Sequence, residues 1–244
     1  MVTEAVRTIR QVLAEIWRRA ITTQPDPGLR TTLILGLAGF VLVSLRLTWK
    51  PVRMLSTVIH EAGHAVTALV SGRRLAGIRL HSDTSGLTLS KGRARGLGMT
   101  LTLASGYPAP TVVALGAAVL LHLGYAVGLM WLLVVACGLM LVQIRNLYGL
   151  WVILVVGAGL VSVSWWMPPL YLSWLAYLLV WLLMLSGPRP LVELARQRRD
   201  GRSRGSDIDQ LARITPVPAF GWLAWFWLLT VAGLVAGGWL LIAA

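Results

Sequence analysis

Three long stretches without Asp, Glu, Lys or Arg limit the fold of this chain more than any other feature. They cover residues 99–144, 147–187 and 214–244. About 20 apolar residues in a helix cross the hydrocarbon part of a bilayer, so each stretch can supply a spanning helix and the first two can each supply two. Hydrophobic residues make up 57% of the chain, a high share for a soluble domain. The sequence therefore predicts an α-helical polytopic membrane protein.

We expect about seven spanning helices (six to seven) in a single membrane-embedded domain over residues 31–244. Two shorter apolar segments precede the uncharged stretches, and Gly, Pro or polar residues divide the stretches themselves. The expected spans lie near residues 31–45, 54–70, 107–127, 129–144, 147–165, 170–186 and 219–242.

Residues 1–30 differ from the rest of the chain. Pro25 and Pro27 separate a first helical segment from the membrane domain. In that segment arginines lie off an apolar stripe, which is typical of a helix at a membrane surface. We therefore expect an N-terminal amphipathic segment on the cytoplasmic face, with a stripe formed by Val2, Val6, Ile9, Leu13, Ile16 and Ala20.

The charge balance indicates the partners and the orientation. The net charge is +13, from 22 Lys and Arg against 9 Asp and Glu. In a soluble protein this would suggest nucleic acid, but here the basic residues lie beside apolar runs, where anionic lipid and the positive-inside rule explain them. We expect no nucleic-acid partner and a multi-pass protein of the cell (inner or plasma) membrane. Its N-terminus and the segments 73–98 and 187–213 would face the cytoplasm.

Cysteine usage and the N-terminus add two expectations. Cys137 is the only cysteine, which excludes an intrachain disulfide and a cysteine-based metal cluster. The first residues lack a short apolar core followed by a small-residue cleavage site, so we expect no cleavable signal peptide.

The run His60-Glu61-Ala62-Gly63-His64 lies inside the apolar segment 54–70. On a helix, two residues four apart share one face, so both imidazoles can reach one metal ion. Glu61 projects about 100° round from His60, close enough to reach a water on that ion. Ionisable groups at membrane depth are costly and usually functional. The motif predicts a zinc site with His60 and His64 as ligands and Glu61 as the catalytic base.

The segment after this helix alternates between apolar and polar residues. Three short runs, at 78–81, 87–90 and 97–103, predict a small antiparallel β-meander at about 75–103. Such a meander offers an edge strand to an extended peptide, or it covers the site. His81 and Asp83 lie at its first turn, where a solvated strand position and an Asx turn are favoured over metal ligation.

A catalytic zinc needs a third ligand, and Asp207 is the preferred candidate. At helical spacing Asp207 aligns with Leu211 and Ile214, a face expected to turn toward the membrane domain. Asp209 precedes Arg213 by four residues, so a helix would give it an ion-pair partner instead.

Alternatives to this assignment stay open. Asp207 could instead be an ordinary helix N-cap, a role that Ser206 could fill equally well. Glu193 is the leading alternative ligand. Asp200 lies among arginines and glycines, in a segment expected to be a polar loop over residues 187–213 and a poor place to hold a ligand rigidly.

The chain resembles the site-2 protease family of intramembrane zinc metallopeptidases, and it is most similar to a small bacterial branch. The resemblance runs from about residue 54 to 225, and its specific part is His-Glu-x-x-His on an early apolar helix followed by short strands. The looser matches are Ser105-Gly106-Tyr107, Arg145-Asn146, and Ser206-Asp207 followed by Leu211, Thr215, Pro218 and Trp222.

The resemblance implies a membrane-embedded zinc endopeptidase that cuts membrane proteins or peptides near or within the cytoplasmic half of the bilayer. It also implies that Asn146 helps to stabilise the oxyanion. The chain departs from the larger family, which takes its third ligand from an Asp-Gly in an intramembrane segment. Here the only Asp-Gly is Asp200-Gly201, in the arginine-rich segment. We expect no PDZ-like domain.

Two other readings of the sequence remain. One is a zincin of another type with Glu193 as the third ligand. The other is a non-proteolytic polytopic scaffold or transporter with a structural metal or none. The zinc content of a His60 variant separates the last reading from the enzymes.

Overall fold

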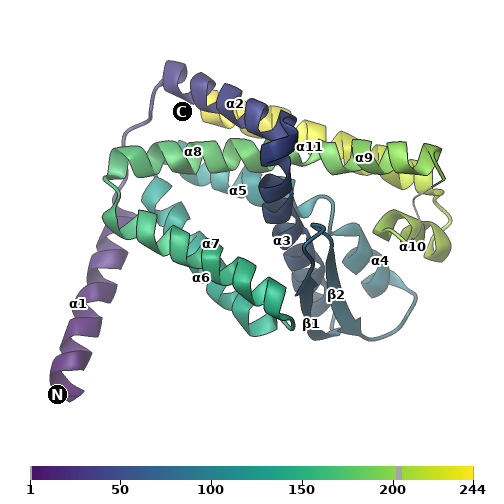
Figure 1. Cartoon of the computed structure of the whole chain (residues 1–244), viewed down its shortest axis with the longest axis horizontal. Helices are drawn as coiled ribbons and strands as arrows, with labels where there is room; N and C mark the ends of the chain where they lie inside the picture. The colour runs from purple at the N-terminus through teal and green to yellow at the C-terminus, as the bar shows by residue number, and fades with distance from the viewer. Residues whose placement is uncertain (1, 202–204, 244) are drawn as a thin grey trace.

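The computed structural model describes residues 2–201 and 205–243, and side chains from residue 7 onward. Within these ranges the chain forms eleven helices and one two-stranded antiparallel sheet (Figure 1). The elements in chain order are α1 (Val2–Ile21), α2 (Leu29–Ser44), α3 (Arg46–Val70), β1 (Arg74–Leu80), β2 (Gly86–Lys91), α4 (Leu97–Ala104), α5 (Ala109–His122), α6 (Ala126–Gln143), α7 (Leu147–Trp166), α8 (Pro169–Ser186), α9 (Pro188–Arg199), α10 (Asp207–Ile214) and α11 (Ala219–Ile242).

The helices confirm a polytopic membrane protein, but not seven spans. Among the described residues, α6, α7, α8 with α9, and α11 are each long and apolar enough to cross a membrane. Two bent pairs raise the number to six at most: α2 with α3, bent by 99°, and α4 with α5, bent by 67°. Segments 31–45 and 54–70 were expected as separate spans. They are instead two arms of one bend at Leu45, whose backbone is extended.

The prediction of a third strand in the meander is wrong, because residues 97–104 form helix α4. The side chains of this helix divide between an exposed face and a buried face. Leu97 and Leu101 are exposed, whereas Thr102 and Leu103 are buried against the rest of the molecule. Since an alternating pattern over seven residues also fits a short buried helix, periodicity alone could not separate the two.

The sheet therefore consists of β1 and β2 alone, with a β-bulge between Leu75 and Gly77. On the other side of β1, the backbone of Ile144 bridges Ile78, and the Arg145 N–H donates to the Ile78 carbonyl at 2.9 Å. The connection between α6 and α7 thus covers the outer edge of β1. Strand β2 is left as the edge strand, on the side of the molecule where α4 and α10 lie (Figure 1).

Residues 187–213 were expected as a loop, but they contain helices α9 and α10. Gly187 keeps helical dihedral angles, so α9 continues directly from α8. Helix α10 packs through Ile208 and Leu211, both fully buried, into a cluster shared with α4, α9 and α11. This packing holds the start of α10 against the membrane helices.

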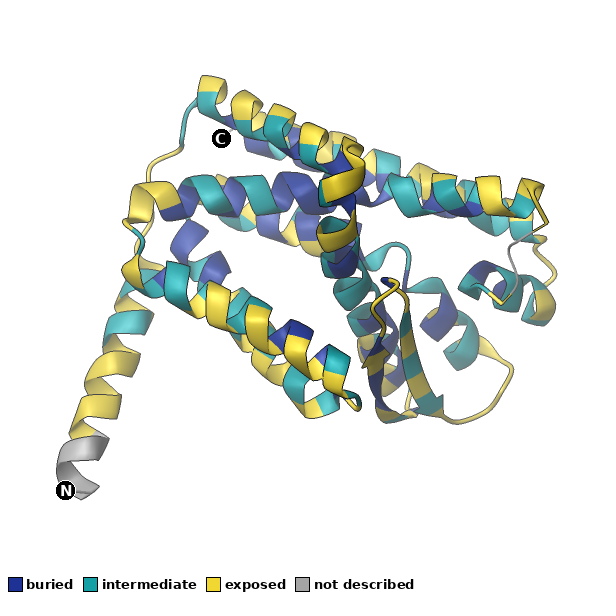
Figure 2. Ribbon diagram, viewed as in Figure 1, coloured by how far each residue is buried: buried dark blue, intermediate teal, exposed yellow. Residues whose placement is uncertain are grey.

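The largest core cluster joins α5, α6, α8 and α11, and it contains Tyr177, Met130 and Met184 among its fully buried side chains. Outer faces of α2, α6 and α7 are exposed along much of their length (Figure 2). Their exposed residues are large and apolar, such as Phe40 and Trp151. This is the distribution expected when lipid rather than water surrounds the helices.

Helix α1 confirms the predicted N-terminal helix and projects away from the body (Figure 1). Leu13 on its stripe is 59% exposed, and Trp17, which lies outside the stripe, is 68% exposed. Its last turn is fixed by Arg19, which donates to the backbone carbonyls of Ser164 and Trp165. The position of α1 on a membrane surface remains a prediction.

Candidate metal centre

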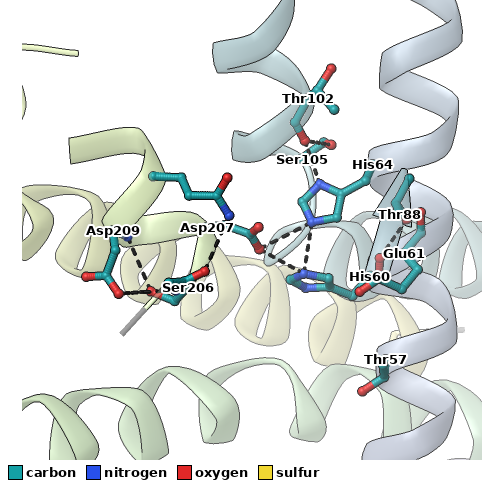
Figure 3. Close-up of polar contacts among 12 residues, drawn as sticks. Thr57, His60, Glu61, His64, Thr88, Thr102, Ser105, Ser206, Asp207 and Asp209 are labelled. Carbon is teal, nitrogen blue, oxygen red and sulfur yellow. Dashed lines mark hydrogen bonds and ion pairs between the residues drawn. The ribbon is translucent and has the colours of Figure 1, made fainter. Parts of the chain in front are cut away.

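The imidazoles of His60 and His64 and the carboxylate of Asp207 converge on one point (Figure 3). The Nε2 atoms of the two histidines are 3.0 Å apart, and Asp207 Oδ2 lies 3.0 Å from His60 Nε2 and 3.2 Å from His64 Nε2. Within the described part of the chain, these three residues are the one His, Cys, Asp and Glu group with metal-binding geometry. The structure thus brings together the three predicted ligands, although 143 residues separate His64 from Asp207.

Asp207 is free for this role because its neighbours cap the helix. Ser206 is the N-cap of α10, with Ser206 Oγ and the Asp209 carboxylate forming a reciprocal capping box. Asp209 also pairs with Arg198 of α9, so the expected pair with Arg213 is wrong. Arg213 instead donates its Nε–H to the backbone carbonyl of Asp209. Asp207 is consequently the first residue inside the helix, and its side chain points at the histidines.

A backbone contact fixes the orientation of His64. Its Nδ1–H donates to the Thr102 carbonyl at 2.6 Å, and since a carbonyl only accepts, Nδ1 carries the proton. Nε2 then faces the ligand group, and it binds a metal through its lone pair once the proton that it shares with Asp207 is released. A second partner of this kind is typical of metal-binding histidines.

The Asp207 carboxyl is kept ionised by its surroundings. Its burial alone would raise the pKa, but hydrogen bonds with His60 and His64 outweigh this effect and hold the pKa below the usual range. The carboxylate is therefore available as a ligand at neutral pH.

Glycines allow the backbone to approach the histidines closely. A Cβ on Gly106 would lie 2.5 Å from His64 Nε2 and 2.6 Å from His60 Cε1. A Cβ on Gly63 would lie 2.5 Å from the Ala109 side chain, so α3 packs tightly against the bend between α4 and α5. The two imidazoles therefore rest directly on this bend.

Glu61 is only 4% exposed and lies outside the ligand group. Thr88 Oγ1, on β2, donates to Glu61 Oε2 at 2.6 Å, and a Cβ on Gly86 would lie 2.5 Å from Glu61 Oε1. Strand β2 thus holds the carboxylate in place from the side. Sequence reasoning missed Thr88 and Gly86, although the alternation at 87–90 already placed Thr88 on the face opposite to Leu87 and Leu89.

The alternative ligands are engaged elsewhere. Glu193 lies between two arginines, 3.1 Å from Arg53 and 3.2 Å from Arg189. Asp83 accepts hydrogen bonds from the Ser85 backbone N–H and hydroxyl, which confirms the predicted Asx turn.

A cavity of about 400 Å³ opens onto the ligand group and Glu61. Residues of α3, β2, α4, α9 and α10 line it, including Arg53 and Glu193. Asn146 is not among them. Its amide group donates to the Leu80 carbonyl at 2.7 Å and its oxygen accepts from the Leu80 N–H at 3.2 Å, so Asn146 pins the end of β1. An oxyanion role for Asn146 would require these bonds to break.

In a comparison with protein-family models, residues 33–238 match the Peptidase M50B-like family. The chain belongs to the Peptidase M50B-like family. This M50B-like chain is therefore a member of the site-2 protease family, as its motifs suggested, and the family points to a membrane metalloprotease. No curated protein and no solved structure matched it. The matched range includes His60, Glu61, His64 and Asp207.

Proposed function

We propose that this chain is a zinc-dependent endopeptidase that hydrolyses peptide bonds of membrane or membrane-associated proteins. One observation carries the proposal: His60, His64 and Asp207 meet beside a buried Glu61, in one cavity. Two histidines and a carboxylate are the ligand set of catalytic zinc in several metallopeptidases, and such a site keeps a fourth position for water.

The distances between the three donor atoms are close to those around a bound zinc ion. Two ligands at about 2.0–2.1 Å from a tetrahedral ion lie about 3.3–3.4 Å apart. The three donor separations are 3.0, 3.0 and 3.2 Å, so small side-chain movements would admit the ion. The sole cysteine, Cys137, is outside this group, so zinc would have nitrogen and oxygen ligands only.

The chain's own residues supply the proton transfers and the positioning. When bound, zinc would lower the pKa of a water molecule and polarise the scissile carbonyl. Glu61 would take the proton of the attacking water at one carboxylate oxygen and pass it to the leaving amine. Thr88 would keep the other oxygen of Glu61 fixed through its 2.6 Å hydrogen bond.

Strand β2 is suited to hold an extended substrate next to Glu61. The backbone groups of Ile78 and Leu80 point toward 144–146, away from β2. In an antiparallel pair their opposite residues, Thr88 and Gly86, then point their own N–H and C=O groups to the outer edge of β2. A substrate strand added there would run past the catalytic carboxylate.

Substitution of Glu61 by Gln tests the function. The amide cannot accept the proton, so Glu61→Gln should keep zinc and lose cleavage. Zinc per chain and the new N-termini formed in a mixture of single-span membrane peptides are both measured, with Glu15→Gln on α1 as the matched control. Cleavage by Glu61→Gln at the parent rate would remove Glu61 from the mechanism. Absence of zinc from the parent would favour the non-proteolytic scaffold or transporter.

We also propose that the cavity faces the cytoplasm and that the N-terminus is cytoplasmic, in the cell membrane. The arginines of 73–98 and 187–199 support this orientation. A cysteine at the exposed Lys91, in a Cys137→Ala background, should react with an impermeant reagent only after the inner face is opened. Labelling from outside in intact cells would reverse the orientation.

A further inference from the structure

A second cavity lies between α9 and α11, on the side of α9 that faces away from the metal centre. Its volume is about 440 Å³. Helix α9 contributes Val192, Ala195, Arg196 and Arg199, which recur at i, i+3, i+4 and i+7 and so form one stripe. The opposite face of the same helix lines the first cavity, for example through Glu193. We call this second cavity the α9–α11 groove.

The wall contributed by α11 is entirely apolar. Phe220, Leu223, Ala224, Trp227 and Leu228 line it, again at helical spacing. Phe220 is 76% exposed, an unusual exposure for a large aromatic side chain in water. Helix α11 is a candidate span without any charged residue, so this wall lies in or beside lipid.

Two arginines at the same groove have no acidic partner among the residues that the structure describes. In the part of the chain that the structure describes, Arg196 and Arg199 form no ion pair, and both are exposed. Other arginines of this helix are engaged: Arg189 pairs with Glu193 and Arg198 pairs with Asp209. The groove therefore combines an apolar wall with two free cations on one face.

We propose that the α9–α11 groove binds an anionic phospholipid. Its phosphate would lie at Arg196 and Arg199, and an acyl chain would cover the α11 wall. Helix α9 carries the chain from the apolar α8 into a charged segment, so the groove crosses the level at which lipid phosphates lie. Guanidinium groups suit phosphate because they donate two parallel hydrogen bonds. A helix of a partner protein fits less well, because it would have to bring acidic residues to the same level.

The site is separate from the metal centre but shares a helix with it. Lipid held on one face of α9 would steady the helix whose other face carries Glu193 and whose Arg198 holds Asp209. The proposal concerns lipid binding alone, so it stands or falls independently of proteolysis.

Native mass spectrometry of the full-length protein in non-ionic detergent tests the site. Phosphatidylglycerol and phosphatidylcholine with identical acyl chains are titrated separately. Arg196→Gln/Arg199→Gln should weaken phosphatidylglycerol binding about 30-fold, the effect of two basic residues near a headgroup. Arg93→Gln/Arg95→Gln, two exposed arginines between β2 and α4, removes the same charge elsewhere and should bind as the parent does. Ala224→Trp fills the groove without a change of charge and should also weaken binding.

Several results would overturn the proposal. Equal retention of the two lipids by the parent would show ordinary contact with bulk lipid. An equal loss in Arg93→Gln/Arg95→Gln would show an effect of net charge alone. Undiminished binding in Ala224→Trp, or displacement of the lipid by inorganic phosphate, would show an anion site that needs no acyl chain. A dimer that Ala224→Trp dissociates would assign the groove to a second copy of the chain. Since Arg196 and Arg199 are exposed, their variant stays interpretable even if Ala224→Trp unfolds.

Discussion

Replacing Gly106 by Ala should displace both histidine ligands with a single methyl group. The new Cβ would lie 2.5 Å from His64 Nε2, whereas ordinary contact begins at 3.4 Å, so the ring must move by about 0.9 Å. Metal–ligand bonds tolerate only about 0.2 Å. A shift of about 0.9 Å would take the 2.6 Å hydrogen bond to the Thr102 carbonyl outside the ordinary range of about 2.7–3.2 Å, whether the bond lengthens or shortens.

We expect the zinc affinity of Gly106→Ala to fall by at least 10- to 100-fold, the effect found when partners of metal ligands are disturbed. Overpacking should also cost about 1–3 kcal/mol of unfolding free energy. Zinc affinity is measured by competition with a chelator, and stability by thermal unfolding. Gly116→Ala on α5 is the matched control, because a Cβ there meets nothing within 4 Å. Zinc affinity in Gly106→Ala within twofold of the parent would refute the packing described for the histidines.

Three further substitutions separate the parts of the site. Gly86→Ala places a Cβ 2.5 Å from Glu61 Oε1, so it should retain zinc but cut the cleavage rate about 100-fold, as seen in turnover assays at saturating zinc. Thr88→Val removes the 2.6 Å hydrogen bond to Glu61 and should slow cleavage about tenfold without loss of zinc; an unchanged rate would show that Thr88 does not position the base. Asp209→Ala removes one half of the capping box and the pair with Arg198. The free energy of unfolding, measured by denaturant titration, should therefore fall by about 1–2 kcal/mol. Stability equal to the parent's would show that these contacts contribute nothing.

The sequence predicted the residues of the site better than the shape around it. His60, Glu61 and His64 follow from local helical spacing, which tertiary packing does not change. Asp207 followed from the same logic, since its alignment with Leu211 indicated an inward face. The structure adds Ser206 as the N-cap, a detail that two adjacent capping residues left undecided.

Long-range contacts were beyond the sequence. The expected Asp209–Arg213 pair obeyed helical spacing, but Arg198 from the preceding helix took its place. The role suggested for Asn146 came from resemblance, and the structure shows its amide bonded to Leu80 at the end of β1. Both cases depend on which segments meet in space, and periodicity within one segment carries no such information.

The expected count of about seven spans is not confirmed, for a related reason. Apolar length sets how many helices can cross a bilayer, but it does not reveal the 99° bend between α2 and α3 or the 67° bend between α4 and α5. Residues 97–103 looked like a strand because Leu97, Met99, Leu101 and Leu103 alternate, and seven residues are too few to distinguish the two periods.

The number of zinc ions bound per chain, measured in the parent and in the Asp207→Ala, Asp209→Ala and His64→Ala proteins, tests the central claim most directly. Our account predicts one zinc in the parent and in Asp209→Ala, and a loss in Asp207→Ala as large as in His64→Ala. Zinc retained by Asp207→Ala at the parent level would contradict the proposed ligand set. Glu193, which lies 3.1 Å from Arg53 in the same cavity, would then be the preferred third ligand.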